Sequence, residues 1–257
     1  MAPTVTDATV RNILDKEGYH RRLAKKVPNL TKTQKKKRVI YGKKYKEFTE
    51  EDWERVAFSD ECYIYIEDSK SRVYVTHRPD EQLLEECLVP SFKQSSIRVM
   101  VWGCIMKDKK GPLVVLEYSG DKGGRMTSKR YQEQVLDAVL KDFYTQMKET
   151  RGSILFQQDS APSHMSKSTK QWFHDYGIPL LYYPPSSPDM NPIERVWHEL
   201  KRLLRLLPHP PTTVRGLQDA VRDAWDSLPI EDINKHVNCM QDRVEDILAA
   251  KGGHTRY

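Results

Sequence analysis

The sequence lacks long apolar runs and closely spaced cysteines. No stretch of roughly 18 or more apolar residues occurs in its 257 residues, so no transmembrane helix and no membrane partner are expected. The N-terminus lacks the charged, apolar and small-residue order of a secretory signal, which predicts an intracellular protein. No Cys-x-x-Cys pair exists, and a structural zinc site is therefore not expected. We interpret the four cysteines as reduced thiols packed as small apolar groups: Cys62, Cys87, Cys104 and Cys239.

Acidic residues are almost absent from the N-terminal part of the chain. Residues 1–46 carry 14 Lys and Arg against three acids, and residues 21–46 carry 12 basic residues and no acid. The remaining 211 residues carry 28 basic and 33 acidic residues. A basic arm on a mildly acidic body fits a polyanionic partner, and such a block also serves nuclear import. The alternative is a flexible, solvated leader.

The pattern of apolar residues predicts an α/β domain. Strands are predicted at 56–66, 72–76, 97–106, 112–118, 154–156 and 178–183. Helical spacing predicts helices at 128–147, 166–176, 192–207, 214–227 and 231–250, and a short helix before Gly18. This order predicts a mixed sheet flanked by helices over residues 51–257, preceded by a basic arm over residues 1–50.

Three acids occupy positions where strands and a helix could bring them together. Asp60 interrupts an otherwise apolar strand, where an unpaired carboxylate would cost several kcal/mol unless it bound a cation. Asp159 follows the strand at 154–156, and α/β proteins place active sites at the carboxyl ends of central strands. Glu194 follows Pro192 in the first turn of a helix, at the margin of the apolar stripe. Each has a simpler interpretation: an outward strand residue, a turn-forming Asp, and a Glu favoured by the helix dipole.

Converging carboxylates at these positions would suit phosphodiester chemistry. Two divalent ions about 3.5–4 Å apart can activate the attacking oxygen and stabilise the leaving oxygen at one phosphorus. Magnesium prefers oxygen ligands and keeps several waters, so a few carboxylates suffice to hold a pair of ions. His198 lies one turn after Glu194 and could either form a Glu–His metal pair or lie at the surface.

Three segments resemble the acidic motifs of the DDE transposases of the Tc/mariner superfamily. Residues 58–61, Phe-Ser-Asp-Glu, resemble the first motif. Residues 157–164 resemble the second, QQDNAPxH, with Ser160 in place of the usual asparagine, and residues 187–197 resemble the third, SPDxNPIExxW. The 34 residues between the second and third acids match the spacing of the Tc-like branch. Trp102-Gly103 and the C-terminal residues 252–257 also resemble sequence features of this family.

This resemblance implies an RNase H-like fold with a mixed five-stranded sheet. It places Asp60 on the first strand, Asp159 after the fourth and Glu194 on a flanking helix, as catalytic and metal-binding residues. Two magnesium ions, for which manganese can substitute, would support hydrolysis that frees 3′-hydroxyl ends, which then attack target DNA in a cut-and-paste reaction. No small-molecule cofactor is implied.

The resemblance also implies double-stranded DNA as partner, both transposon ends and target, bound by a homodimer in the nucleus. The candidates for DNA contact are Arg21, Arg22, Lys25, Lys26, Lys35, Lys36, Lys37, Arg38, His164, Asn191 and Lys201. For the last three of these residues, a packing or capping role is an equal alternative.

The N-terminal region departs from the family pattern. Relatives begin with two helix-turn-helix units, whereas here only Thr9–Tyr19 resembles the end of the second unit. A recognition helix needs its supporting helices, so we expect salt-sensitive, nonspecific DNA contact through residues 21–46. The alternative function is a transposon-derived DNA-binding protein without catalytic activity.

Overall fold

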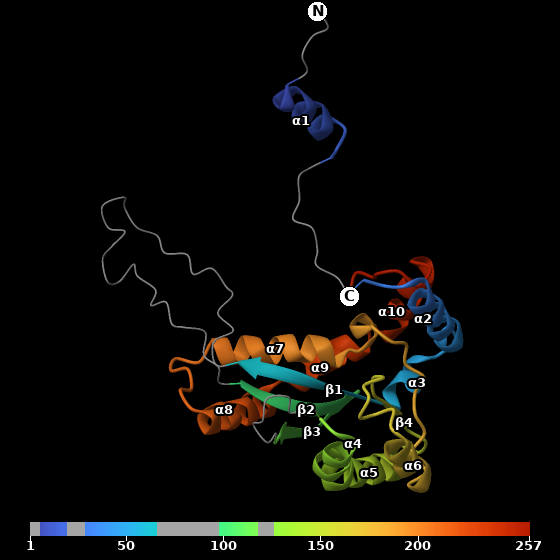
Figure 1. The fold of residues 1–257 in the computed structure, drawn as a ribbon, viewed down its shortest axis with the longest axis vertical. Coiled ribbons are helices and arrows are strands. Elements are labelled where there is room, and N and C mark those ends of the chain that lie inside the picture. Colours follow the sequence, from blue (N-terminus) through green and yellow to red (C-terminus); the bar gives the residue numbers. More distant parts are fainter. Residues whose placement is uncertain (1–5, 20–28, 66–97, 118–125) are drawn as a thin grey trace, which may run out of the picture.

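Four strands form one mixed sheet at the centre of the structure (Figure 1). The computed structural model describes residues 6–19, 29–65, 98–117 and 126–257. The strands, in the order β3-β2-β1-β4, are β1 (Val56–Tyr65), β2 (Arg98–Met106), β3 (Lys109–Leu116) and β4 (Leu155–Gln157). Strand β1 runs antiparallel to β2 and parallel to β4, so the sheet is mixed, as predicted.

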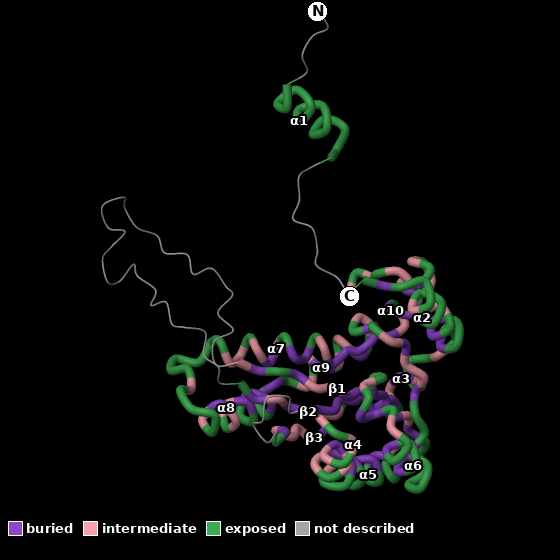
Figure 2. Tube along the Cα trace, viewed as in Figure 1, coloured by how far each residue is buried: buried purple, intermediate pink, exposed green. Residues whose placement is uncertain are grey.

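Helices cover both faces of this sheet (Figure 1). One layer consists of α4 (Ser128–Tyr131), the π-helix η2 (Gln132–Leu140), α5 (Lys141–Arg151) and α6 (Lys167–Asp175). The other consists of α2 (Lys32–Tyr45), α3 (Glu50–Glu54), α7 (Ile193–Arg205), α8 (Val214–Ser227), α9 (Ile230–Val237) and α10 (Met240–Ala249). Helix α1 (Asp7–Lys16) buries none of its residues (Figure 2). None of the helices in the described ranges is long and apolar enough to cross a membrane.

Alternation along β1 divides the core into two apolar clusters. Phe58, Cys62 and Ile64 belong to the cluster that includes helices α7 to α10, whereas Ala57 belongs to the cluster that includes η2, α5 and α6. Successive strand residues point to opposite faces of a sheet, so even-numbered residues of β1 face α7 and odd-numbered residues face η2. This alternation decides where each polar residue of β1 points.

The predicted strand at 178–183 is not formed as a full strand. Only Leu180 pairs with β4, through a single parallel bridge to Phe156. Pro179 has no N–H to donate, and the Tyr182 amide donates to the Tyr45 hydroxyl at 2.8 Å instead of to a strand. The sheet of the described residues therefore has four strands rather than five. The predicted strand at 72–76 lies outside the described residues.

The predicted helix at 231–250 consists of two helices, α9 and α10, that meet at residues 238–239. The side chains of Asn234 and Asn238 bind the turn between β2 and β3: Asn234 Oδ1 accepts from the Asp108 amide at 2.8 Å, and Asn238 Oδ1 accepts from Lys107 Nζ. These bonds hold α9 against the sheet, while α10 packs against α2. The remaining predicted helices and strands agree with the structure to within a few residues.

Helix α2, from the predicted basic arm, is held on the body by Arg38. The Arg38 guanidinium donates to both carboxylate oxygens of Asp189 at 2.7 and 2.6 Å. It also donates to the Ser187 hydroxyl and to the carbonyls of Gly252 and Gly253 at 2.8–3.0 Å. All five guanidinium N–H groups are therefore used. Arg38 has no donor left for a phosphate, so its prediction as a DNA contact does not fit the structure.

A glycine allows the C-terminal segment to pack against α2. Gly252 has a φ of +79°, and a Cβ there would lie 2.2 Å from the Lys35 carbonyl oxygen. Gly177 has a similar φ of +62° but open space around it. We expect Gly177→Ala to cost about 1 kcal/mol, from backbone strain alone, and Gly252→Ala about 3 kcal/mol or more, because α2 must also move. Equilibrium chemical unfolding measures both, and equal losses would contradict the close packing.

Candidate active site

The pairing of two parallel strands brings Asp60 and Asp159 to the same level. The last pair between β1 and β4 is Phe58 with Gln157, and each acid lies two residues beyond it. Ser59 holds this register: its hydroxyl donates to the Gln157 carbonyl at 2.8 Å, and its amide donates to the Gln157 side chain at 3.2 Å. The register therefore places Asp60, in the middle of β1, level with Asp159, which lies two residues past the carboxyl end of β4.

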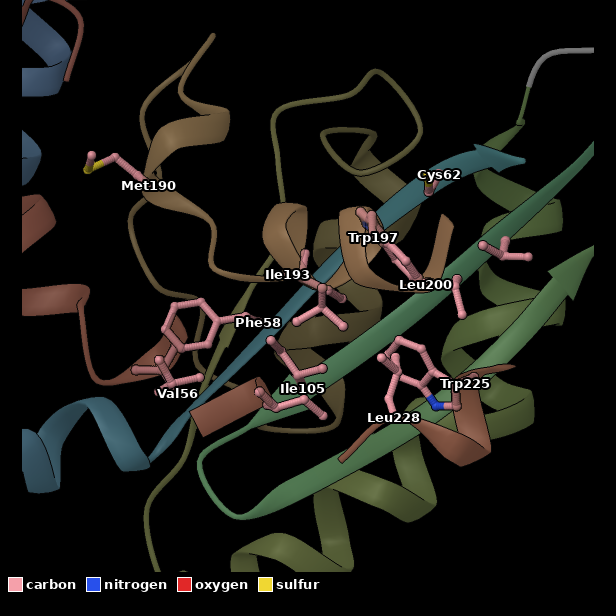
Figure 3. Packing of buried hydrophobic residues seen from close by; sticks show 14 of the residues in the cluster. Val56, Phe58, Cys62, Ile105, Met190, Ile193, Trp197, Leu200, Trp225 and Leu228 are labelled. Carbon is pink, nitrogen blue, oxygen red and sulfur yellow. The ribbon is translucent and has the colours of Figure 1, made fainter. Parts of the chain in front are cut away.

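Helix α7 places Glu194 above this position because its apolar face lies directly on the sheet. Gly103 of β2 pairs with Asp60, and a Cβ on Gly103 would lie 2.6 Å from the Trp197 ring. The missing side chain thus leaves room for the indole beside Asp60. Figure 3 shows Ile193, Trp197 and Leu200 directed from α7 into the core against the strands. Glu194 lies nearly one turn before Trp197, and therefore at the edge of the contact between α7 and the sheet.

Asn191 ties the segment before α7 to β1. Its Nδ2 donates to the Ser59 carbonyl at 3.0 Å, and its Oδ1 accepts from the Ile193 amide at 3.4 Å. Asn191 is buried, and its bonds join the start of the helix to the residue before Asp60. Its contacts are those of a capping and positioning residue, the alternative left open for it from sequence.

One cavity of about 330 Å³ is lined by all three candidate carboxylates. Asn191 and Tyr183 line it as well, together with residues of the segments that follow β4 and precede α7. The structure therefore brings Asp60, Asp159 and Glu194 to one solvent-connected space, from the middle of β1, the segment after β4 and the first turn of α7.

The charges in this cavity are not balanced. Burial, followed by the charge of Glu194, raises the pKa of Asp60 well above its usual range. Burial also raises the pKa of Glu194, although the Lys201 charge and a hydrogen bond with Asp60 oppose this. Within the described ranges, no group of three or more acidic, His or Cys side chains forms a ready metal site. Crowded carboxylates facing one space are nevertheless the hard oxygen donors that a magnesium ion requires.

Asp159 is held by a histidine that a second acid also contacts. His164 is buried, with Nδ1 2.7 Å from Asp159 Oδ1 and Nε2 3.2 Å from Glu61 Oε1. Burial lowers the pKa of His164, but the hydrogen bonds with Asp159 and Glu61 outweigh it and raise the pKa to about 10. The protonated ring can then donate to both carboxylates, and His164 positions Asp159 from inside the protein.

Glu61 was not predicted as a site residue. It follows Asp60 in β1 and therefore points to the opposite face of the sheet, toward His164. The sequence signal that could have identified it is this alternation, combined with the histidine five residues after Asp159.

The remaining candidates lie in different environments. Lys201 is half-buried, and its charge acts on Glu194. His198 is exposed and lines a different cavity from Glu194, so the two do not form a metal pair. The three candidate lysines of α2 are exposed: Lys35, Lys36 and Lys37. Four candidates lie outside the described residues: Arg21, Arg22, Lys25 and Lys26.

Comparison with known proteins assigns the family. A family described as "DDE superfamily endonuclease" matches residues 55–212, and one described as "Transposase" matches residues 2–47. The chain is 30% identical to the Tc3 transposase of Caenorhabditis elegans over 97% of its own length and 71% of that protein. The chain belongs to the Tc1/mariner DDE transposases. DNA cleavage and strand transfer during transposition are the reactions of this family.

Two further similarities extend this assignment. The Tc1 transposase of Caenorhabditis elegans is 29% identical over 99% of this chain and 89% of that protein. The Mos1 mariner paired-end complex with manganese has the same fold, with a TM-score of 0.78 at 16% identity over 98% of this chain and 72% of that one. The N-terminal match over residues 2–47 is longer than the Thr9–Tyr19 stretch inferred from the sequence.

The contact between Gly103 and Trp197 predicts a specific loss of activity in this transposase. Gly103→Ala should push the indole and α7 outward and cost about 1–3 kcal/mol of stability. A shift of Glu194 by about 1 Å should lower the cleavage rate about 100-fold even where the protein remains folded. Gly216→Ala, in the first turn of α8, is the control, since a Cβ there would come no closer than 3.2 Å to its nearest neighbour, the Thr213 hydroxyl. Wild-type cleavage by folded Gly103→Ala would contradict the role of this contact.

Proposed function

We propose that this transposase cuts and joins DNA with two magnesium ions held by Asp60, Asp159 and Glu194. The observation that carries the proposal is the single cavity that these three carboxylates line. When bound, the ions would activate the attacking oxygen and stabilise the leaving oxygen at the phosphorus. Manganese should substitute, because it accepts the same oxygen ligands.

The protein's own residues prepare this site in three ways. The bonds of Ser59 and Asn191 fix Asp60 relative to α7. The His164 ring orients Asp159 and balances its charge, while Glu61 holds the other ring nitrogen. Burial raises the pKa of both Asp60 and Glu194, and the charge of Glu194 raises that of Asp60 further, so a divalent cation is favoured because it replaces the proton as the compensating charge.

We propose double-stranded DNA as the partner, both transposon ends and target, bound by a homodimer in the nucleus. The N-terminal match to a transposase family supports contact through residues 2–47, a region that carries Lys35, Lys36 and Lys37 exposed on α2. The similar Mos1 structures are described as paired-end complexes, which supports a dimer that joins two ends.

A nicking assay separates this proposal from a DNA-binding protein without catalytic activity. Plasmid nicking with Mg²⁺ or Mn²⁺ should fall about 1,000-fold in Asp159→Asn, which corresponds to about 4 kcal/mol of barrier. Asp175→Asn, an exposed acid at the end of α6, should nick at the wild-type rate. If wild type and Asp159→Asn were equally inactive while both bound DNA, the non-catalytic alternative would hold.

Joining of pre-cleaved DNA ends distinguishes a strand transferase from a nuclease of the same fold that only cuts DNA. Wild type should produce joined products from ends that carry a free 3′-hydroxyl, and removal of divalent ions with a chelator should abolish them. Re-addition of Mg²⁺ or Mn²⁺ should restore joining. Cleavage without joined products would assign nuclease activity instead.

A further inference from the structure

A second cavity, of about 380 Å³, lies between α7, α9, α10 and the C-terminal residues. Arginine and histidine side chains dominate its lining: Arg195, His198, His236, Arg243 and Arg256. Glu194 and Arg195 are consecutive residues of α7, yet Glu194 lines the active-site cavity and Arg195 lines this one. We call it the basic cavity.

Arg243, in the wall of the basic cavity, is a buried cation without a carboxylate partner in the described ranges. Its side chain is 1% exposed. One Nη donates to the Asp189 carbonyl at 2.6 Å, and the Tyr257 ring lies 4.5 Å from Cζ, but Nε has no partner. A carbonyl and an aromatic ring supply no full negative charge. A buried charge without compensation costs several kcal/mol, so Arg243 requires an anion that the described chain does not supply.

The acids around the basic cavity are already engaged by other cations. Glu199 accepts from Arg202 Nε at 2.8 Å, and Asp246 pairs with Arg256 Nε at 3.0 Å. Arg195 is exposed at the rim, and its charge adds to that of Arg243. His236 Nε2 is buried without a partner. Burial, followed by the charges of Lys235 and Arg243, lowers the pKa of His236 to about 4, as expected in a positive environment.

We propose that the basic cavity binds a phosphate group of the DNA backbone, with Arg195 and Arg243 as its ligands. A phosphate offers several acceptor oxygens, which suits guanidinium groups reaching it from two helices. Helix α7 then contributes both to the active-site cavity, through Glu194, and to a phosphate contact beside it, through Arg195. The proposal rests on DNA as the substrate of this transposase, but not on catalysis.

DNA binding measured against salt concentration tests the proposal without any cleavage. Fluorescence anisotropy with a labelled duplex, performed in the Asp159→Asn background without divalent ions, gives the slope of log affinity against log salt. Arg195→Gln should reduce that slope by about 1, as expected for one lost phosphate contact, and weaken binding about 10-fold at low salt. Arg222→Gln, an exposed arginine of α8 outside both cavities, should leave the slope unchanged.

Inorganic phosphate is the second probe. At equal ionic strength, phosphate in place of chloride should raise the unfolding midpoint of the wild type by about 2–4 °C. Arg195→Gln and Arg243→Gln should both lose this increment, whatever their own stability, and Arg222→Gln should keep it. Arg195 is exposed, so its variant remains a test even if Arg243→Gln does not fold.

Two results would overturn the proposal. A midpoint that does not respond to phosphate in wild type means that no anion site exists, and an equal response in Arg195→Gln means that Arg195 is not a ligand of the anion. A phosphate increment that depends on Arg195, combined with an unchanged salt slope for DNA, means that the cavity takes free anions and not the DNA backbone. In both cases the nicking and joining results stand independently.

Discussion

The active-site geometry depends on close contact between one helix and two strands. Trp197 lies against Gly103, where a side chain would occupy the space of the indole, and Asn191 bonds the Ser59 carbonyl. Both contacts lie within a few residues of an acid. Apolar packing is short-ranged and intolerant of added volume, so it holds α7 at a defined distance from β1. On a loosely packed helix, charge repulsion would move Glu194 away from the other two carboxylates.

The sheet places two sets of charges on opposite faces. Asp60 faces α7 and Glu194, whereas Glu61 faces the η2 layer and contacts His164. His164 reaches Asp159 from that second side, so a protonated ring compensates one carboxylate. Burial raises the pKa of Glu194 despite the charge of Lys201, and burial together with the charge of Glu194 raises the pKa of Asp60. The site therefore combines one carboxylate that is paired with a histidine and two whose pKa is raised by burial.

The third acidic motif also serves as a structural junction. The Asp189 carboxylate accepts from Arg38 of α2 and from Thr255, and its carbonyl accepts from Arg243 of α10. Segments from both ends of the chain thus converge on the residues that precede Glu194. The two arginines that are buried in the described part of the chain differ in compensation: Arg38 faces a carboxylate, whereas Arg243 contacts a carbonyl and a ring there. Arg38 therefore forms a structural ion pair, whereas Arg243 keeps a donor, Nε, that no described residue accepts from.

Local sequence determined most of the elements and indicated three acids that line one cavity, because strand alternation, helical periodicity and motif spacing are short-range properties. It predicted that Asp60, Asp159 and Glu194 belong together, but not the distances or the compensating charges. Tertiary structure decided that Leu180 forms one bridge and not a strand, since the Tyr182 amide binds Tyr45, which is distant in sequence. It also decided that Arg38, one of several similar basic residues in the sequence, is buried and that Glu61 joins the site. Burial and charge pairing depend on which distant segments meet, and no local pattern contains that information.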